Sequence, residues 1–126
     1  MIRHDEENFQ VGVVRFLRMA GHFVFAVPNG GNRNLREAAR LKLQGVTAGV
    51  SDLILLLPGK VYFIELKNPN GKGRQSPSQR EFEDTVRGYG HDYLLWDKWA
   101  QVEQFVNTHR NEVGNYLEVG GTDAEK

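Results

Sequence analysis

Residues 53–66, LILLLPGKVYFIEL, constrain the fold of this chain more than any other segment. Two strongly apolar runs, rich in aliphatic and aromatic side chains, flank a proline that is followed directly by a glycine. That pair suits the two central positions of a type II turn, so the pattern predicts a β-hairpin that turns between Leu57 and Lys60. In this register Asp52 lies opposite Glu65, whereas a three-residue loop would shift the pairing by one residue.

Charged side chains are predicted to converge at the open end of this hairpin. Directly opposed residues share a face of the sheet, with Cβ atoms roughly 4.5–5.5 Å apart, and Lys67 lies two residues beyond Glu65 on that face. Asp52 and Glu65 repel each other unless positive charge lies between them. Lys67 supplies one such charge, and Mg²⁺ or Mn²⁺, which prefer oxygen ligands, would supply more. An ion pair at a strand end explains Glu-x-Lys alone, but the opposed aspartate favours a metal site.

The remaining periodicity predicts a single domain of the α/β class. A helix separates the second hairpin strand from a further strand, so these two strands are expected to be parallel and joined by a right-handed crossover. The result is a central mixed β-sheet flanked by helices, with the helices at the two chain ends covering its two faces. The predicted helices span 5–19, 35–45, 76–87 and 98–110, and the predicted strands outside the hairpin span 22–27 and 91–96.

Composition and charge restrict the classes of protein that the chain can represent. Its 126 residues are expected to form one domain over 1–114, followed by a disordered polar tail over 115–126. The absence of cysteine excludes disulfides and thiolate metal sites. The net charge is zero, yet residues 30–90 hold ten Lys and Arg against six Asp and Glu. No apolar run suits a membrane span and the N-terminus does not read as a signal peptide, so a cytoplasmic protein without a membrane partner is expected.

The order of residues around the hairpin resembles the core of the PD-(D/E)XK nuclease superfamily, in which an aspartate, a hydrophobic hairpin and Glu-x-Lys follow one another. Here Ser51 precedes Asp52 where a proline is typical, and the carboxylate is retained. Further blocks are similar, in their order and spacing, to the VRR-NUC domain of that superfamily over about residues 6–97. They read EENFQ, VVRFL, VPNGGNR, GVTAGVSDL, FIELKNPNGK and SPSQREF. The resemblance implies a restriction-endonuclease-like fold and a location in a bacterial or phage-infected cell.

The resemblance also implies roles for individual residues. Asp52 and Glu65 would bind the metal ion together with the main-chain carbonyl of Leu66. Lys67 would either act on the attacking water or neutralise charge on the reacting phosphate, and both roles stay open. Gln79 matches the family glutamine in SPSQ and would contact the water or the phosphate, although glutamine is also an ordinary residue in the first turn of a helix.

Two glutamates compete for the family position in the first helix. In the family this glutamate precedes a glutamine by four residues, which selects Glu6 ahead of Gln10. The helical wheel agrees independently, because Glu6 lies about 50° and Glu7 about 150° from the centre of the apolar face at 100° per residue. We therefore expect Glu6 to reach the site and Glu7 to face solvent near the positive end of the helix dipole.

The loops VPNGGNR and NGKGR look like segments that contact DNA phosphates. Glycine lets the backbone approach a phosphate closely, and amide and basic side chains around it offer hydrogen-bond donors. Loops of this composition are also common on protein surfaces, so the signal is weaker than that of the hairpin. The residues expected to bind DNA are Asn29, Gly30, Arg33, Arg36, Lys72 and Arg74.

Together these features predict an endodeoxyribonuclease that hydrolyses phosphodiester bonds with Mg²⁺ or Mn²⁺ as cofactor. Stand-alone relatives of this size include dimeric Holliday-junction resolvases, so the resemblance implies branched DNA as substrate and a homodimer as the working unit. One alternative is a nuclease without branch specificity. The other is a noncatalytic DNA-binding module on a nuclease-like scaffold, which would gain nothing from acidic side chains that face phosphate.

Overall fold

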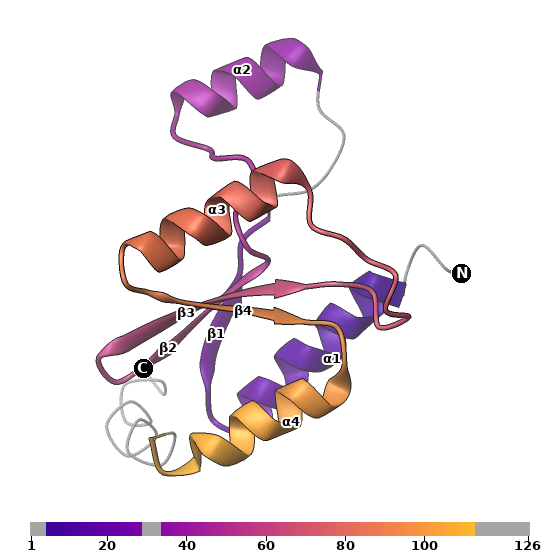
Figure 1. Ribbon diagram of the computed structural model, residues 1–126, viewed down its shortest axis with the longest axis vertical. Helices are drawn as coiled ribbons and strands as arrows, with labels where there is room; N and C mark the ends of the chain where they lie inside the picture. Colours follow the sequence, from indigo (N-terminus) through magenta and orange to yellow (C-terminus); the bar gives the residue numbers. More distant parts are fainter. Residues whose placement is uncertain (1–4, 29–33, 113–126) are drawn as a thin grey trace, which may run out of the picture.

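The computed structural model describes residues 5–28 and 34–112, and these form an α/β domain with a mixed four-stranded sheet (Figure 1). The predicted class is confirmed. The predicted polar tail lies outside the described residues. The elements are α1 (Asp5–Met19), β1 (Phe23–Ala26), α2 (Leu35–Leu43), β2 (Leu53–Leu57), β3 (Lys60–Leu66), α3 (Pro77–Gly88), β4 (Asp92–Trp96) and α4 (Trp99–Thr108).

The sheet order is β1-β2-β3-β4, with antiparallel pairing between the first three strands and parallel pairing between β3 and β4. Leu57 lies opposite Lys60, which confirms the predicted register of the hairpin. Gly59 has a φ of 73°, the left-handed conformation that the third position of a type II turn requires. A proline and a glycine therefore determine which side chains of β2 and β3 share a face.

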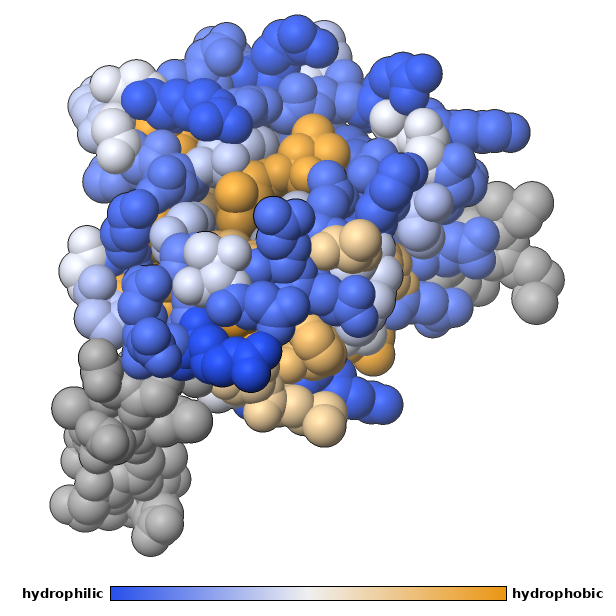
Figure 2. All heavy atoms as spheres, turned by 60° about the horizontal axis from the view of Figure 1, so that its bottom comes forward, coloured by the Kyte–Doolittle hydropathy of each residue, from blue (hydrophilic) through white to orange (hydrophobic). Residues whose placement is uncertain are grey.

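One face of the sheet carries the hydrophobic core beneath α1 and α4. Alternate strand residues point into this core, among them Leu55 and Ile64, which are fully buried. Phe105 of α4 lies over the sheet with its ring centroid 5.1 Å from that of Tyr62. Figure 2 brings this side of the molecule forward and shows a mostly hydrophilic surface with a limited group of hydrophobic side chains near its middle.

The expectation that the two terminal helices cover opposite faces is wrong. They lie side by side on the core face, where Trp99 of α4 packs against Phe16 of α1 with ring centroids 5.1 Å apart (Figure 1). The opposite face is covered by α3, whose Phe82 packs against Phe63 of β3 with ring centroids 5.7 Å apart. Since α3 connects two neighbouring parallel strands, it has to cross one face of the sheet, and both terminal helices pack on the other.

Helix α2 stands away from the sheet beyond α3 (Figure 1). Within the described part of the chain it buries none of its residues, and Leu35 and Leu43 are 90% and 88% exposed. Its start is capped by Asn34, whose side chain accepts a hydrogen bond from the backbone N–H of Glu37 at 2.7 Å. Of the helices in the described ranges, none has the length and apolar character needed to cross a membrane.

Candidate active site

The hairpin register brings Asp52 and Glu65 to the same end of one sheet face. Leu53 pairs with Ile64, so the next residues along each chain are these two acids. They lie on the face that α3 covers, because the core-facing residues alternate with them. Asp52 accepts a hydrogen bond through Oδ2 from the backbone N–H of Leu66 at 2.7 Å. The half-buried Asp52 is thereby tied to the strand that carries Glu65.

Glu65 is a buried carboxylate whose two oxygens have different partners. Its side chain is 1% exposed. Oε1 accepts hydrogen bonds from Gln75 Nε2 at 3.1 Å and from the hydroxyl of Tyr93. Oε2 accepts no hydrogen bond from the described residues and lies 3.2 Å from the ammonium nitrogen of Lys67. One oxygen is therefore held by protein donors while the other faces the charged end of the site.

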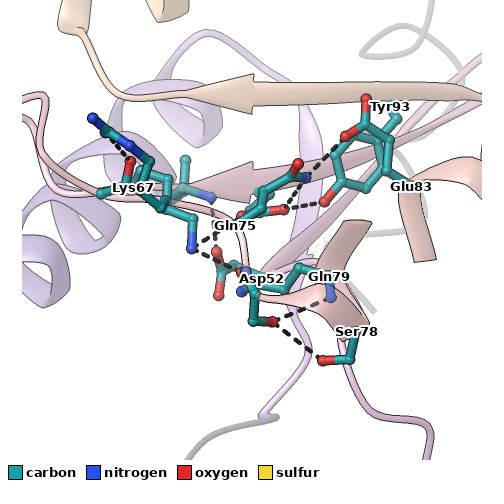
Figure 3. A network of polar contacts seen from close by, with 12 residues as sticks. Asp52, Lys67, Gln75, Ser78, Gln79, Glu83 and Tyr93 are labelled. Carbon is teal, nitrogen blue, oxygen red and sulfur yellow. Dashed lines mark hydrogen bonds and ion pairs between the residues drawn. The ribbon is translucent and has the colours of Figure 1, made fainter. Parts of the chain in front are cut away.

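Lys67 is held over the site from two directions. Its Nζ donates to Oε1 of Gln79 at 2.9 Å, in addition to its ion pair with Glu65 (Figure 3). A Cβ added at Gly73 would lie 3.1 Å from both Cβ and Cδ of Lys67, so glycine lets the basic loop pack closely on this side chain. The lysine is only 12% exposed, and its ammonium group has a defined position.

Gln79 joins the start of α3 to the lysine. Its N–H donates to the Ser76 hydroxyl at 3.2 Å, and its Oε1 accepts from the Ser76 N–H at 2.8 Å, which forms a capping box. Gly49, with a φ of 83°, allows the preceding linker to pass against this helix start, since a Cβ there would overlap the backbone of Ser78. The helix cap and the position of Lys67 are therefore coupled through one side chain.

Glu6 of α1 interacts electrostatically with the charged residues of the site. Partial burial, followed by the negative charge of Asp52, raises the pKa of Glu6, and Lys67 opposes the shift. Burial also raises the pKa of Asp52, with the charge of Glu65 acting in the same direction against the hydrogen bond from Leu66. Three acids from α1, the residue before β2, and β3 thus influence one another.

Two carboxylates form the donor set that this site offers to a divalent cation. Among the described residues, no group of three or more His, Asp or Glu side chains is arranged closely enough to hold a metal ion. Asp52 and Glu65 nevertheless supply carboxylate oxygens at one point, and Oε2 of Glu65 is buried without a hydrogen bond from described residues. When Glu6, Asp52 and Glu65 are ionised and Lys67 is protonated, the site has a net charge of −2. These oxygen donors and this charge fit Mg²⁺ or Mn²⁺.

The structure describes three of the six residues expected to bind DNA. Lys72 and Arg74 are exposed on the loop that leaves β3 directly after Lys67, and Arg36 is exposed on α2. Two side chains shape the loop. The Asn68 side chain accepts a hydrogen bond from the N–H of Asn70, and the Asn70 side chain accepts one from the N–H of Lys72. Asn29, Gly30 and Arg33 lie outside the described residues.

Three polar residues of the site were missed by the sequence analysis: Gln75, Glu83 and Tyr93. Gln75 and Tyr93 donate hydrogen bonds to Glu65, and Glu83 accepts one from Gln75; Figure 3 labels all three beside Lys67 and Gln79 in the same network. Burial, and next the hydrogen bond to Glu65, raise the pKa of Tyr93, so its hydroxyl stays protonated and donates. For Tyr93 the only sequence signal is the alternation of side chains along β4. That signal locates the residue only once the register between β3 and β4 is known.

Comparison with solved structures identifies proteins that share the fold of this α/β domain. A structure described as a VRR_NUC domain protein aligns with a TM-score of 0.64 at 20% identity, covering 87% of this chain and 88% of the other. A second, described as VRR_NUC domain, aligns with a TM-score of 0.59 at 19% identity, covering 82% and 95%. No family model and no curated protein matches the sequence. The chain therefore has the VRR_NUC fold that its motifs predict.

Proposed function

We propose that this protein is an endodeoxyribonuclease that hydrolyses DNA phosphodiester bonds with a divalent metal ion. The observation that carries the proposal is the position of Asp52 opposite the buried Glu65, whose Oε2 accepts no hydrogen bond from described residues and is ion-paired with the Lys67 ammonium. Burying two carboxylates at the end of an apolar hairpin is unfavourable for folding alone. The shared fold with VRR_NUC structures supports the same reading.

Asp52, Glu65 and the main-chain carbonyl of Leu66 would hold Mg²⁺ or Mn²⁺, with Glu6 contributing charge from α1. When bound, the ion lowers the pKa of a water and stabilises negative charge on the phosphate. In hydrolysis the water gives up a proton to solvent as its oxygen bonds to phosphorus, the bond from phosphorus to the leaving oxygen breaks, and the leaving oxygen takes up a proton from solvent.

Lys67 is suited to electrostatic stabilisation in this scheme. Its ammonium group is ion-paired with Glu65 at 3.2 Å and donates to Gln79 at 2.9 Å, so it has a fixed position from which it would stabilise negative charge on the phosphate. Gln79 fixes the lysine and the helix start together. Lys72 and Arg74 on the adjacent loop would bind the phosphates that flank the cut.

The substrate we propose is branched DNA, cut by a homodimer. Two symmetric cuts at a four-way junction require two sites in fixed geometry, and a twofold dimer provides them. Helix α2 offers a surface for this contact, because Leu35, Ala39 and Leu43 are exposed and lie at intervals of four residues on one face. A twofold axis near Ala39 would place Leu35 opposite Leu43 of the partner subunit.

The dimer surface is tested by sedimentation of the purified protein. Leu43→Lys is expected to shift the wild-type dimer towards the monomer, because a charge on each copy would be buried in the contact. Met19→Lys is the matched control, since Met19 is 81% exposed on α1, and it is expected to leave the dimer intact. A monomeric wild type, or equal effects of both variants, would contradict the proposed surface.

The proposed activity is tested by incubating the protein with linear, flapped and four-way DNA in Mg²⁺, in Mn²⁺ and in EDTA. Cleavage is expected only with metal, and fastest on the four-way junction. Lys67→Gln is expected to bind DNA but cut it at least about a hundredfold more slowly. A protein that binds all three DNAs and cuts none would instead be the noncatalytic DNA-binding module, and equal rates on all three would remove branch specificity.

A further inference from the structure

A closed ring of polar contacts joins Glu65 to α3 and β4. Gln75 Nε2 donates to Oε1 of Glu65 at 3.1 Å and to Oε1 of Glu83 at 2.9 Å. The other oxygen of Glu83 accepts from Arg87 Nε at 2.8 Å, and Arg87 Nη2 donates to the carbonyl of Tyr93 at 3.1 Å. The Tyr93 hydroxyl then returns to Oε1 of Glu65. Figure 3 shows Gln75, Glu83 and Tyr93 gathered on one side of the site.

The contacts to Glu65 are strongly asymmetric. Both neutral donors, the Gln75 amide and the Tyr93 hydroxyl, point at the same oxygen, Oε1. Oε2 is left with the Lys67 ammonium and no hydrogen bond from the described residues. Two donors from different elements fix both the position and the rotation of a carboxylate, since a rotated group would lose one of them.

The sheet geometry explains why Tyr93 can act here. In the parallel pair of β3 and β4, Tyr93 lies beside Phe63, two residues before Glu65 and on the same face. Its ring packs edge-on against Phe82 of α3, with centroids 6.2 Å apart, so the hydroxyl emerges under the helix towards Glu65. Only 2% of the residue is exposed, which makes the hydroxyl a donor with a fixed direction.

We propose that Tyr93 and Gln75 are positioning residues that hold Oε1 of Glu65 and thereby direct Oε2 towards a divalent cation. The inference rests on the proposed function and deepens it, because it assigns the support of the metal ligand. Hydrogen bonds that orient metal ligands typically contribute 10–100-fold to metal affinity or activity. The remainder of the ring, Glu83 and Arg87, fastens α3 to the sheet without touching Glu65.

The experiment measures Mn²⁺ binding to the metal-free protein by calorimetry, and separately the Mg²⁺ concentration that gives half-maximal cleavage. Tyr93→Phe keeps the ring and removes the donor, and Gln75→Met keeps the chain length and removes the amide. Each is expected to weaken Mn²⁺ binding by about tenfold or more and to raise the Mg²⁺ requirement equally. Cleavage at saturating Mg²⁺ is expected to stay within roughly threefold of wild type.

Arg87→Gln is the matched control. It opens the ring by removing the contacts to Glu83 and to the Tyr93 carbonyl, but it leaves both donors on Glu65 in place. We expect it to lower thermal stability and to leave Mn²⁺ affinity unchanged. The comparison separates positioning of the carboxylate from simple fastening of α3.

Several outcomes would overturn the inference. Wild-type Mn²⁺ affinity in Tyr93→Phe and in Gln75→Met would show that the contacts serve folding alone. The same conclusion follows if Arg87→Gln weakens Mn²⁺ binding as much as they do. If Tyr93→Phe fails to fold, Gln75→Met in the loop before α3 decides the result. A wild-type protein that binds no Mn²⁺ would overturn the proposed function itself, and the inference with it.

Discussion

Lowering the pH from 7.5 to 5 is expected to destabilise the fold by about 2 kcal/mol through one buried side chain, His22. This residue is 4% exposed, and neither ring nitrogen has a hydrogen-bond partner among the described residues. Burial lowers the pKa of His22 from 6.5 to about 4, with the charge of His109 acting in the same direction and that of Glu112 opposing it. The imidazole is therefore neutral in the folded protein at assay pH.

Stability falls on acidification because the unfolded chain binds a proton at His22 more readily than the folded chain does. Above pH 6.5 the imidazole is neutral in both folded and unfolded chains, so it contributes no pH dependence there. Below pH 6.5 the unfolded chain binds the proton and the folded chain does not, so stability falls as the pH falls towards 4. The difference between the two pKa values corresponds to about 3.4 kcal/mol when fully developed, of which about 2 kcal/mol is present at pH 5.

Urea unfolding at pH 7.5 and pH 5 measures this loss, and His22→Phe provides the control. The imidazole lies 5.5 Å from the ring of Phe105 without a hydrogen bond from described residues, so an apolar ring can take its place. The variant is expected to lose about 2 kcal/mol less than wild type on acidification. Equal losses in the two proteins would refute the assignment to His22.

Three further tests, which use five substitutions, examine the site and the linker beside it. Glu6→Gln is expected to slow cleavage far more than Glu7→Gln, because the charge of Glu6 interacts with Asp52; equal small effects would leave α1 with a structural role only. Gly49→Ala is expected to reduce stability by at least about 2 kcal/mol, and Gly59→Ala by about 1 kcal/mol. Both glycines have positive φ, but only a Cβ at Gly49 meets backbone, so equal losses in denaturant unfolding would contradict the close approach. Asp52→Asn is expected to unfold at the same or a higher temperature in metal-free buffer, since it removes a partly buried charge, and a clearly lower temperature would contradict a site that opposes folding.

The hairpin and its paired acids could be predicted because the signals are local. The Pro58–Gly59 turn sets the register, and the register then decides that Asp52 and Glu65 are opposed. The start of α3 was predicted to within one residue, since the predicted helix begins at Ser76 and the observed one at Pro77. Each of these inferences needs only residues close together in sequence.

The support around Glu65 and the placing of the helices could not be predicted in this way. Tyr93 lies 28 residues from Glu65, and their contact depends on the register of a parallel pair that no turn defines. The periodicity of α2 predicted a helix correctly but carried no information on its packing, because its apolar residues are exposed. Long-range pairing and the choice of sheet face are properties of the whole domain.

The most direct test of the proposed active site is the rate of DNA cleavage by wild type and by Asp52→Asn, in Mg²⁺ and in EDTA. The asparagine can still accept the hydrogen bond from Leu66, so the fold is expected to persist and DNA binding to remain. We predict that wild type cuts only with Mg²⁺ and that Asp52→Asn cuts at least about a hundredfold more slowly. Cleavage by the variant at the wild-type rate, or undiminished wild-type cleavage in EDTA, would contradict the proposed metal-dependent site.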